Sequence, residues 1–133
     1  MSKRFVYYQP NNKDLKDQFS DCQVRALSKA LNISWVEAFD LTIPICREMQ
    51  TYTIFGGTCE IGKESLRRIG FTYSGISNKK GSKRPTVDSF AKDHPTGTYI
   101  AKVAHHVVAI VDGKYYDTWD SGQKSIYGYY EKI

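Results

Sequence analysis

Apolar residues in the first half of the chain recur at helical spacing, and the first such run follows two good helix caps. Ser20 and Asp21 can each accept a hydrogen bond from the free backbone N–H groups of a helix that starts there. The apolar face of this helix consists of Val24, Leu27 and Leu31. The pattern therefore places Cys22 in the first turn of the helix.

Three more helices are indicated by caps and by apolar periodicity. Ser34 and Glu37 have the spacing of a capping box, in which each side chain accepts a hydrogen bond from the backbone N–H of the other residue. The helices are expected over residues 34–50, 62–69 and 87–93. The last of them is short and would be capped by Thr86.

The pattern changes at Thr98, where β-branched and aromatic residues take over. Asp112-Gly113 lies between two such runs and is a strong signal for a two-residue hairpin turn. Strands are expected over residues 98–103, 106–111, 114–119 and 125–130. We therefore predict an α+β protein in which N-terminal helices pack on a C-terminal antiparallel sheet.

Length and composition fit one domain over residues 1–133. Hydrophobic residues make up 41% of the chain and charged residues 25%, which are ordinary values for a globular domain. We expect a helical half over about 18–70, a basic loop rich in Gly and Ser over 74–85, and a sheet half over about 97–131. Because no apolar run is long enough to cross a membrane, we expect no membrane partner and a cytoplasmic location.

The cysteines and histidines argue against a metal site or a disulfide framework. The three cysteines are an odd number and have no CxxC spacing. The adjacent His105 and His106 should point to opposite faces of a strand, where they cannot share a metal ion. We expect no cofactor, and we expect Cys46 and Cys59 to have structural roles.

The net charge of +5 is concentrated in the second half of the chain. Residues 61–133 carry twelve basic and seven acidic side chains, whereas the first sixty residues carry seven of each. Four cations of the predicted loop form a candidate surface for an acidic or nucleic-acid partner: Lys79, Lys80, Lys83 and Arg84. The alternative is a solvated loop that binds nothing.

The predicted hairpin brings an acid and a base together. With Asp112-Gly113 as the turn, His106 pairs with Trp119 and becomes a diagonal neighbour of Asp117 on the same face of the sheet. An imidazole and a carboxylate at that separation can form a hydrogen bond. Such a pair is the base and the orienting group of a nucleophilic triad.

Two structural alternatives to this interpretation remain open. His106 can be a core histidine that is simply bonded to Asp117. In the same register His105 pairs with Asp120 on the opposite face, where a surface salt bridge would form. We prefer His106 because its face of the sheet is the apolar one.

Cys22 is the candidate nucleophile for such a triad. The positive end of a helix dipole and a nearby imidazolium both favour a thiolate at a helix N-terminus. Gln18, four residues upstream, is a candidate side-chain donor to the oxyanion of the reaction. The alternative is that Cys22 is a small buried hydrophobic residue.

The order of these parts resembles papain-like cysteine peptidases, in particular the compact domains of bacteria and their phages. The segments that carry the resemblance are Asp21–Leu27 around the cysteine and His106–Asp117 around the histidine and the carboxylate. The similarity extends over about residues 18–130. In that superfamily the nucleophile opens a helix, and the base and its orienting group come from neighbouring strands of a later sheet.

The resemblance implies a role for each of the three residues: Cys22 is the nucleophile, His106 the general base and Asp117 the orienting carboxylate. Peptidases of the superfamily often have a glutamine six residues before the cysteine. Lys16 occupies that position here, so Gln18 or Asn12 would have to take its place.

The expected function is therefore that of a cysteine-dependent hydrolase, which cleaves a peptide, isopeptide or related acyl bond in a peptide or protein substrate. An acyltransferase with the same triad is one alternative. Another is a non-catalytic phage or bacterial protein that binds or inhibits its partner through the basic surface. Likeness of fold does not decide between these functions.

Overall fold

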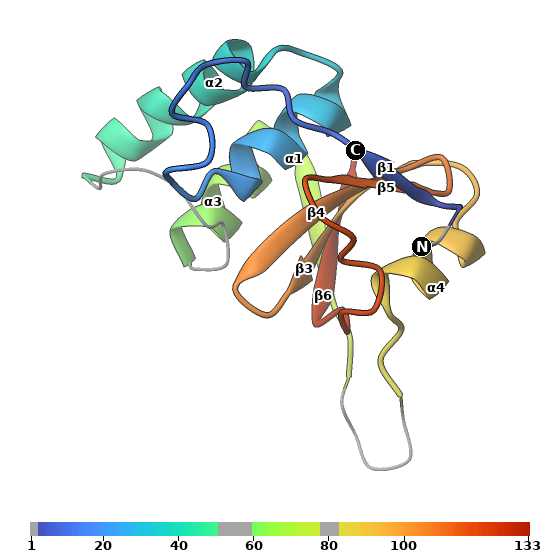
Figure 1. The fold of residues 1–133 in the computed structure, drawn as a ribbon. Coiled ribbons are helices and arrows are strands. Elements are labelled where there is room, and N and C mark those ends of the chain that lie inside the picture. The colour runs from blue at the N-terminus through green and yellow to red at the C-terminus, as the bar shows by residue number, and fades with distance from the viewer. Residues whose placement is uncertain (1–2, 51–59, 78–82) are drawn as a thin grey trace.

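Four helices and a twisted six-stranded sheet make up the computed structural model, which describes residues 3–50, 60–77 and 83–133 (Figure 1). The helices are α1 (Cys22–Leu31), α2 (Trp35–Glu48), α3 (Glu60–Ile69) and α4 (Val87–Asp93). The strands are β1 (Phe5–Tyr7), β2 (Phe71–Gly75), β3 (Thr98–Val103), β4 (His106–Val111), β5 (Lys114–Asp117) and β6 (Gly128–Lys132). The predicted α+β class is confirmed.

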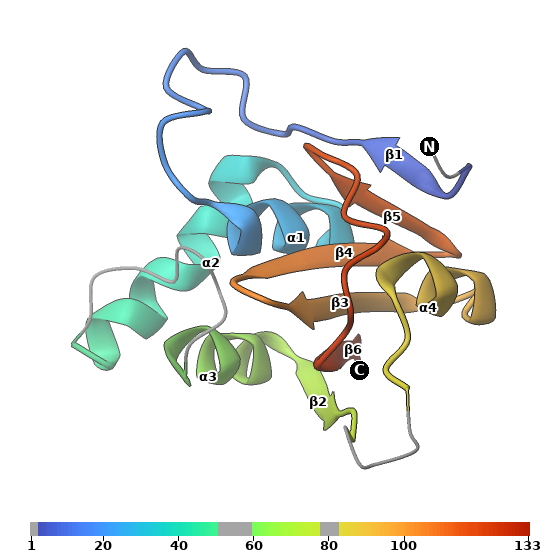
Figure 2. The same ribbon diagram turned by 60° about the horizontal axis from the view of Figure 1, so that its bottom comes forward.

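The helices cover both faces of the sheet. Val107 and Ala109 of β4 belong to a core cluster with α1 and α3. Val108 and Ile110, which point the other way along the same strand, belong to a second cluster with α4. Helix α2 packs on α1, and α4 lies across the sheet from α1 (Figure 2).

The sheet is mainly antiparallel, as predicted, but one of its pairings is parallel. Its strand order is β1-β5-β4-β3-β6-β2, so both edge strands come from outside the predicted sheet half. Strand β1 pairs in parallel with β5, where Phe5 lies opposite Tyr115. Strand β2 pairs antiparallel with β6. Local periodicity missed both strands because their pairing partners lie far away in the sequence and β1 has only three residues.

The Asp112-Gly113 turn and its register are confirmed. Asp112 and Gly113 have φ angles of 49° and 80°, which are the left-handed conformations of a type I′ turn. The ladder pairs Val111 with Lys114 and Ile110 with Tyr115, as predicted. Strand β5 ends at Asp117 rather than at residue 119, and its carboxylate accepts a hydrogen bond from the Thr118 N–H.

The caps that the sequence predicts for α2 and α4 are present, whereas the side chain of Asp21 makes no capping hydrogen bond at the start of α1. Ser34 and Glu37 form both hydrogen bonds of the capping box, each with a length of 3.1 Å. Thr86 caps α4 in the same way through Ser89. Caps of this kind stabilise a helix by about 1 kcal/mol, which helps to explain why both helix starts were predictable.

Some predicted boundaries were wrong. Helix α3 begins at Glu60, two residues before the predicted start, and ends as expected before Gly70, which has a φ of +125°. Ser74 and Gly75 belong to β2 and not to the basic loop. Lys79, Lys80 and Cys59 lie outside the described residues. Within the described ranges, no helix has the length and apolar character that crossing a membrane requires.

Candidate active site

The candidate nucleophile, Cys22, is the first residue of α1 and lies against the core. The residue is 3% exposed, and it packs in the cluster that also holds Val107. Asp21, the N-cap residue, makes no capping hydrogen bond with its side chain. The side chain of Asp21 therefore does not take up the backbone N–H groups of the first turn of α1.

His106 and Asp117 meet as the predicted register requires. His106 Nε2 lies 2.6 Å from Asp117 Oδ2. The histidine is the first residue of β4, after a turn in which His105 has a φ of 54°, and the aspartate is the last residue of β5. Ser121 also donates its hydroxyl to Asp117 Oδ2, at 3.0 Å. The carboxylate is thus held in place from two sides.

Cys22 completes the set, because its side chain and that of His106 form a hydrogen bond. Since Nε2 of the imidazole is bonded to Asp117, Nδ1 is the ring nitrogen left for the thiol. The structure therefore brings together Cys22, His106 and Asp117, from α1, β4 and β5. Their order in space is nucleophile, base and orienting carboxylate.

The surroundings of His106 favour its protonated form. Burial lowers the pKa of this imidazole, but its hydrogen bonds to Asp117 and Cys22, together with the negative charges of both groups, raise the pKa to about 9. An imidazolium at neutral pH stabilises a thiolate beside it. The arrangement can therefore hold a thiolate–imidazolium pair, which is the reactive form of a cysteine nucleophile.

A second layer of charge lies behind Asp117. Arg25, one turn along α1 from the cysteine, forms ion pairs with Asp21 and with Asp117 Oδ1, the second at 3.5 Å. The indole N–H of Trp35 donates to Asp21 Oδ2 at 2.8 Å. Both carboxylates are almost completely buried, so the guanidinium compensates two desolvated charges.

Trp119 forms the outer wall of the site. Its ring centroid lies 5.0 Å from that of His106 and the ring is tilted by 38°. The side chain is 43% exposed, whereas His106 beneath it is buried. Trp119 and His106, which the sequence register paired across the hairpin, are therefore neighbours although β5 ends before residue 119.

Gln18 is not brought to the site by any contact that the structure describes. It lies exposed in a turn before α1, where its backbone N–H donates to the Leu15 carbonyl. The backbone N–H groups at the start of α1 are the donors closest in sequence to the Cys22 sulfur. The role of Gln18 as an oxyanion donor stays a prediction.

The geometry decides between His105 and His106 as the partner of a carboxylate in the site. His105 is exposed in the turn between β3 and β4, and Asp120 accepts a hydrogen bond from the Tyr115 hydroxyl at 2.6 Å. The argument that only the His106 face is apolar was wrong, because both faces of β4 are buried beneath helices. His94 lies 2.7 Å from the Phe90 carbonyl through Nδ1, as expected for a histidine at a helix end.

Sequence reasoning missed the residues that support the carboxylate. Asp21 and Arg25 have the i, i+4 spacing of a helical ion pair, so this signal was available. Ser121 and Trp35 carried no such signal, because their contacts with the site depend on how loops and α2 pack.

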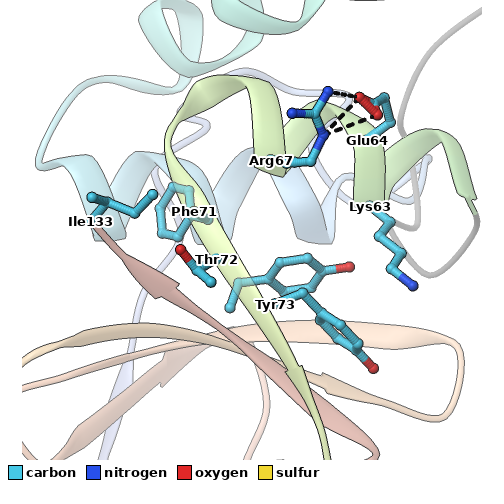
Figure 3. Close-up of a pocket in the computed structure, with 8 residues that line it drawn as sticks. Lys63, Glu64, Arg67, Phe71, Thr72, Tyr73 and Ile133 are labelled. Carbon is cyan, nitrogen blue, oxygen red and sulfur yellow. Dashed lines mark hydrogen bonds and ion pairs between the residues drawn. The ribbon is translucent and has the colours of Figure 1, made fainter.

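A groove lies away from these residues. It has a volume of about 610 Å³ and runs between α3 and the edge strand β2 (Figure 3). Tyr73 and Tyr130 pack on its floor with centroids 4.9 Å apart, and Lys63 Nζ lies 4.7 Å from the Tyr73 centroid. Arg67 at its rim is bonded to Glu64. None of the three candidate active-site residues lines this groove.

In the part of the chain that the structure describes, no group of three or more His, Cys, Asp and Glu side chains is placed to hold a metal ion. Comparisons of the chain with protein-family models, with curated proteins and with solved structures gave no match.

Proposed function

We propose that this protein is a cysteine-dependent hydrolase that cleaves a peptide, isopeptide or related acyl bond. The observation that carries the proposal is the position of His106, which is bonded to Asp117 through Nε2 and to the Cys22 thiol at the start of α1. A papain-like mechanism uses this set of groups in this order.

In the first half of the reaction, the Cys22 thiolate attacks the carbonyl carbon of the substrate and forms a C–S bond. The carbonyl electrons move to oxygen, and the N–H groups at the start of α1 face the developing oxyanion with the positive end of the helix dipole. When the intermediate collapses, the bond to the leaving group breaks and the His106 imidazolium gives it a proton. A thioester on Cys22 and a neutral His106 result.

In the second half, neutral His106 takes a proton from water, and the oxygen of that water attacks the thioester. The C–S bond breaks, which returns the thiolate and leaves the proton on His106. Asp117 keeps the ring oriented and stabilises the imidazolium throughout, with Ser121 and Arg25 holding the carboxylate.

A small activated ester tests the proposal without knowledge of the natural substrate. We expect p-nitrophenyl acetate to release nitrophenolate in a burst and to leave one acetyl group on Cys22, seen by peptide mass spectrometry. Cys22→Ser should lose the burst, while Cys46→Ser, a change at a buried cysteine of α2, should keep it. Bursts of equal size in the parent and in Cys22→Ser would contradict the proposal.

An acyltransferase with the same three residues is the nearest alternative. The two activities differ only in whether water or an amine accepts the acyl group. Partition of the acetyl-enzyme between water and added glycinamide decides between them, because an acyltransferase transfers most of the acetyl group to the amine at millimolar concentration.

Binding through the basic surface is a second candidate function, and one arrangement favours it. Lys83 is exposed, and the Arg84 guanidinium lies 4.8 Å from the Tyr127 ring, next to the loop that joins β2 and α4. The double variant Lys83→Glu, Arg84→Glu should lose this function. The Cys22→Ala variant should keep it. For a nucleic-acid partner the affinity should also fall steeply with salt.

A further inference from the structure

A pocket of about 360 Å³ opens between the segment that precedes α1 and the N-terminus of α2. Its apolar walls are Pro10, Leu15, Phe19, Trp35 and Val36. We call it the Trp35 pocket. Its volume is at the low end of the range of about 300–1,000 Å³ found for ligand sites, which suits a single side chain better than a whole ligand.

Three of the walls of the Trp35 pocket are apolar side chains that are exposed to solvent. Leu15 and Val36 are each 61% exposed, and Phe19 is at 36%. Exposed apolar residues that gather around one concavity are typical of a binding site, whereas scattered ones are not. None of the described lining residues is acidic and Lys13 is among them, so a cationic group is disfavoured.

Several contacts hold Trp35, the back wall of the pocket, in place. The Trp35 ring stacks on Phe39, with centroids 5.2 Å apart and planes 10° apart. Phe19 packs edge-on against it, at 6.3 Å and 74°. The indole N–H is fixed by its hydrogen bond to Asp21. A preformed aromatic wall loses little entropy when an apolar group binds to it.

The Trp35 pocket lies close to the candidate nucleophile. Phe19 is three residues before Cys22, so their Cα atoms are separated by no more than about 11 Å even in a fully extended chain. Asp21, to which Trp35 is hydrogen-bonded at 2.8 Å, directly precedes the cysteine. A substrate side chain one to three residues from the bond that is cleaved spans a comparable distance.

We propose that the Trp35 pocket receives a bulky apolar side chain, aromatic or branched, of the peptide or acyl substrate on which Cys22 acts. The inference rests on the proposed function and adds a substrate class to it. Binding energy realised so near the reacting bond raises kcat/KM for substrates that carry such a side chain.

Binding is tested first, in a way that does not require catalysis. The chain has two tryptophans, so the indole N–H signal of Trp35 in a ¹⁵N-labelled Cys22→Ala protein is assigned with Trp119→Phe. We expect N-acetyl-phenylalanine methylamide to shift this signal to saturation and the alanine analogue to leave it unchanged. Leu15→Asp or Val36→Asp should weaken binding roughly tenfold or more.

Leu41→Asp is the matched control, because Leu41 is an exposed apolar residue of α2 that does not line the pocket. It should bind the phenylalanine probe as the parent does. Equal shifts from both probes, or unchanged affinity in Leu15→Asp, would overturn the assignment of the pocket.

A kinetic experiment tests the substrate preference of the pocket separately from the proposed hydrolase activity. In the parent, kcat/KM for an N-acetyl-phenylalanine thioester should exceed that for the alanine thioester at least tenfold, and Leu15→Asp should remove the difference. Cys22 acylation with no preference overturns the substrate assignment alone. If the phenylalanine probe binds but neither thioester acylates Cys22, both the hydrolase proposal and the substrate role of the pocket fail.

Discussion

Arg25 joins the helix that carries Cys22 to the carboxylate that orients His106. Its Nη2 lies 3.5 Å from Asp117 Oδ1, and its Nη1 is bonded to Asp21, the residue before the cysteine. One guanidinium faces two buried carboxylates, so the network keeps a net negative charge when His106 is neutral. That charge favours a proton on His106, in line with the raised pKa of its imidazole.

Removal of Arg25 should cost much more stability than removal of a surface cation. Arg25→Ala leaves Asp21 and Asp117 buried with less compensation, and breaking a buried pair in this way costs about 3–5 kcal/mol of the free energy of unfolding. The control is Arg4→Ala. Arg4 Nη1 lies 3.4 Å from Asp88 Oδ2 with both side chains partly exposed, so the expected cost of losing this pair is about 0–1 kcal/mol.

Urea denaturation of both variants measures the difference. Similar losses for Arg25→Ala and Arg4→Ala would contradict a supporting role for the buried network.

The His106 ring should titrate far above an ordinary histidine. Its hydrogen bonds to Asp117 and Cys22 raise the pKa to about 9, against 6.5 for a free side chain. Asp117→Asn removes the larger of the two favourable contributions and should lower the pKa, and Cys22→Ala should lower it as well. Ring ¹⁵N shifts in an NMR titration report the protonation of His106 directly. A parent ring that titrates near 6.5 would refute the coupling among the three groups.

The same shift predicts how stability depends on pH. Because the folded-state pKa of His106 lies above its unfolded value, the folded protein holds a proton between pH 6.5 and about 9 that the unfolded chain releases. The contribution is fully present below pH 6.5 and is lost as the pH rises toward 9. The free energy of unfolding should fall over this window in the parent and fall less in His106→Ala. Equal slopes in the two proteins would show that His106 is not the group responsible.

The part of the site that could be read from the sequence is the part that local signals encode. Asp112-Gly113 fixes the hairpin register by its backbone conformation, and the register places His106 beside Asp117. The start of α1 follows from its apolar spacing, which puts Cys22 at the helix N-terminus. Turns and helix starts are determined by a few consecutive residues, so they can be predicted from a single sequence.

The remaining features depend on residues that are distant in the sequence. Strand β1 exists because its backbone pairs with β5 at the other end of the chain. Trp35 reaches Asp21 only because α2 folds back along α1, and Ser121 reaches Asp117 from a loop. Such contacts follow from tertiary packing, and no periodicity in the sequence reports them.

The rate of alkylation of Cys22 should depend on pH differently from that of an ordinary thiol. If Cys22 and His106 form a thiolate–imidazolium pair, the rate of labelling with iodoacetamide stays nearly constant between pH 6 and 8. A free thiol with a pKa of about 8.5 instead labels roughly tenfold faster with each unit of pH in that range. His106→Ala should convert Cys22 from the first behaviour to the second.

Cys46 supplies the internal control for this experiment, because it is a buried thiol of α2 without an imidazole among its described contacts. Burial raises the pKa of the Cys46 thiol, so it should label slowly at neutral pH in parent and variant alike. Peptide mass spectrometry reads each cysteine separately in one sample. A Cys22 rate that climbs with pH in the parent would contradict the ion pair. If Cys22 resists the reagent at every pH, the NMR titration of His106 decides, since a thiolate beside the ring requires that Cys22→Ala lower the pKa of the imidazole below the parent value of about 9.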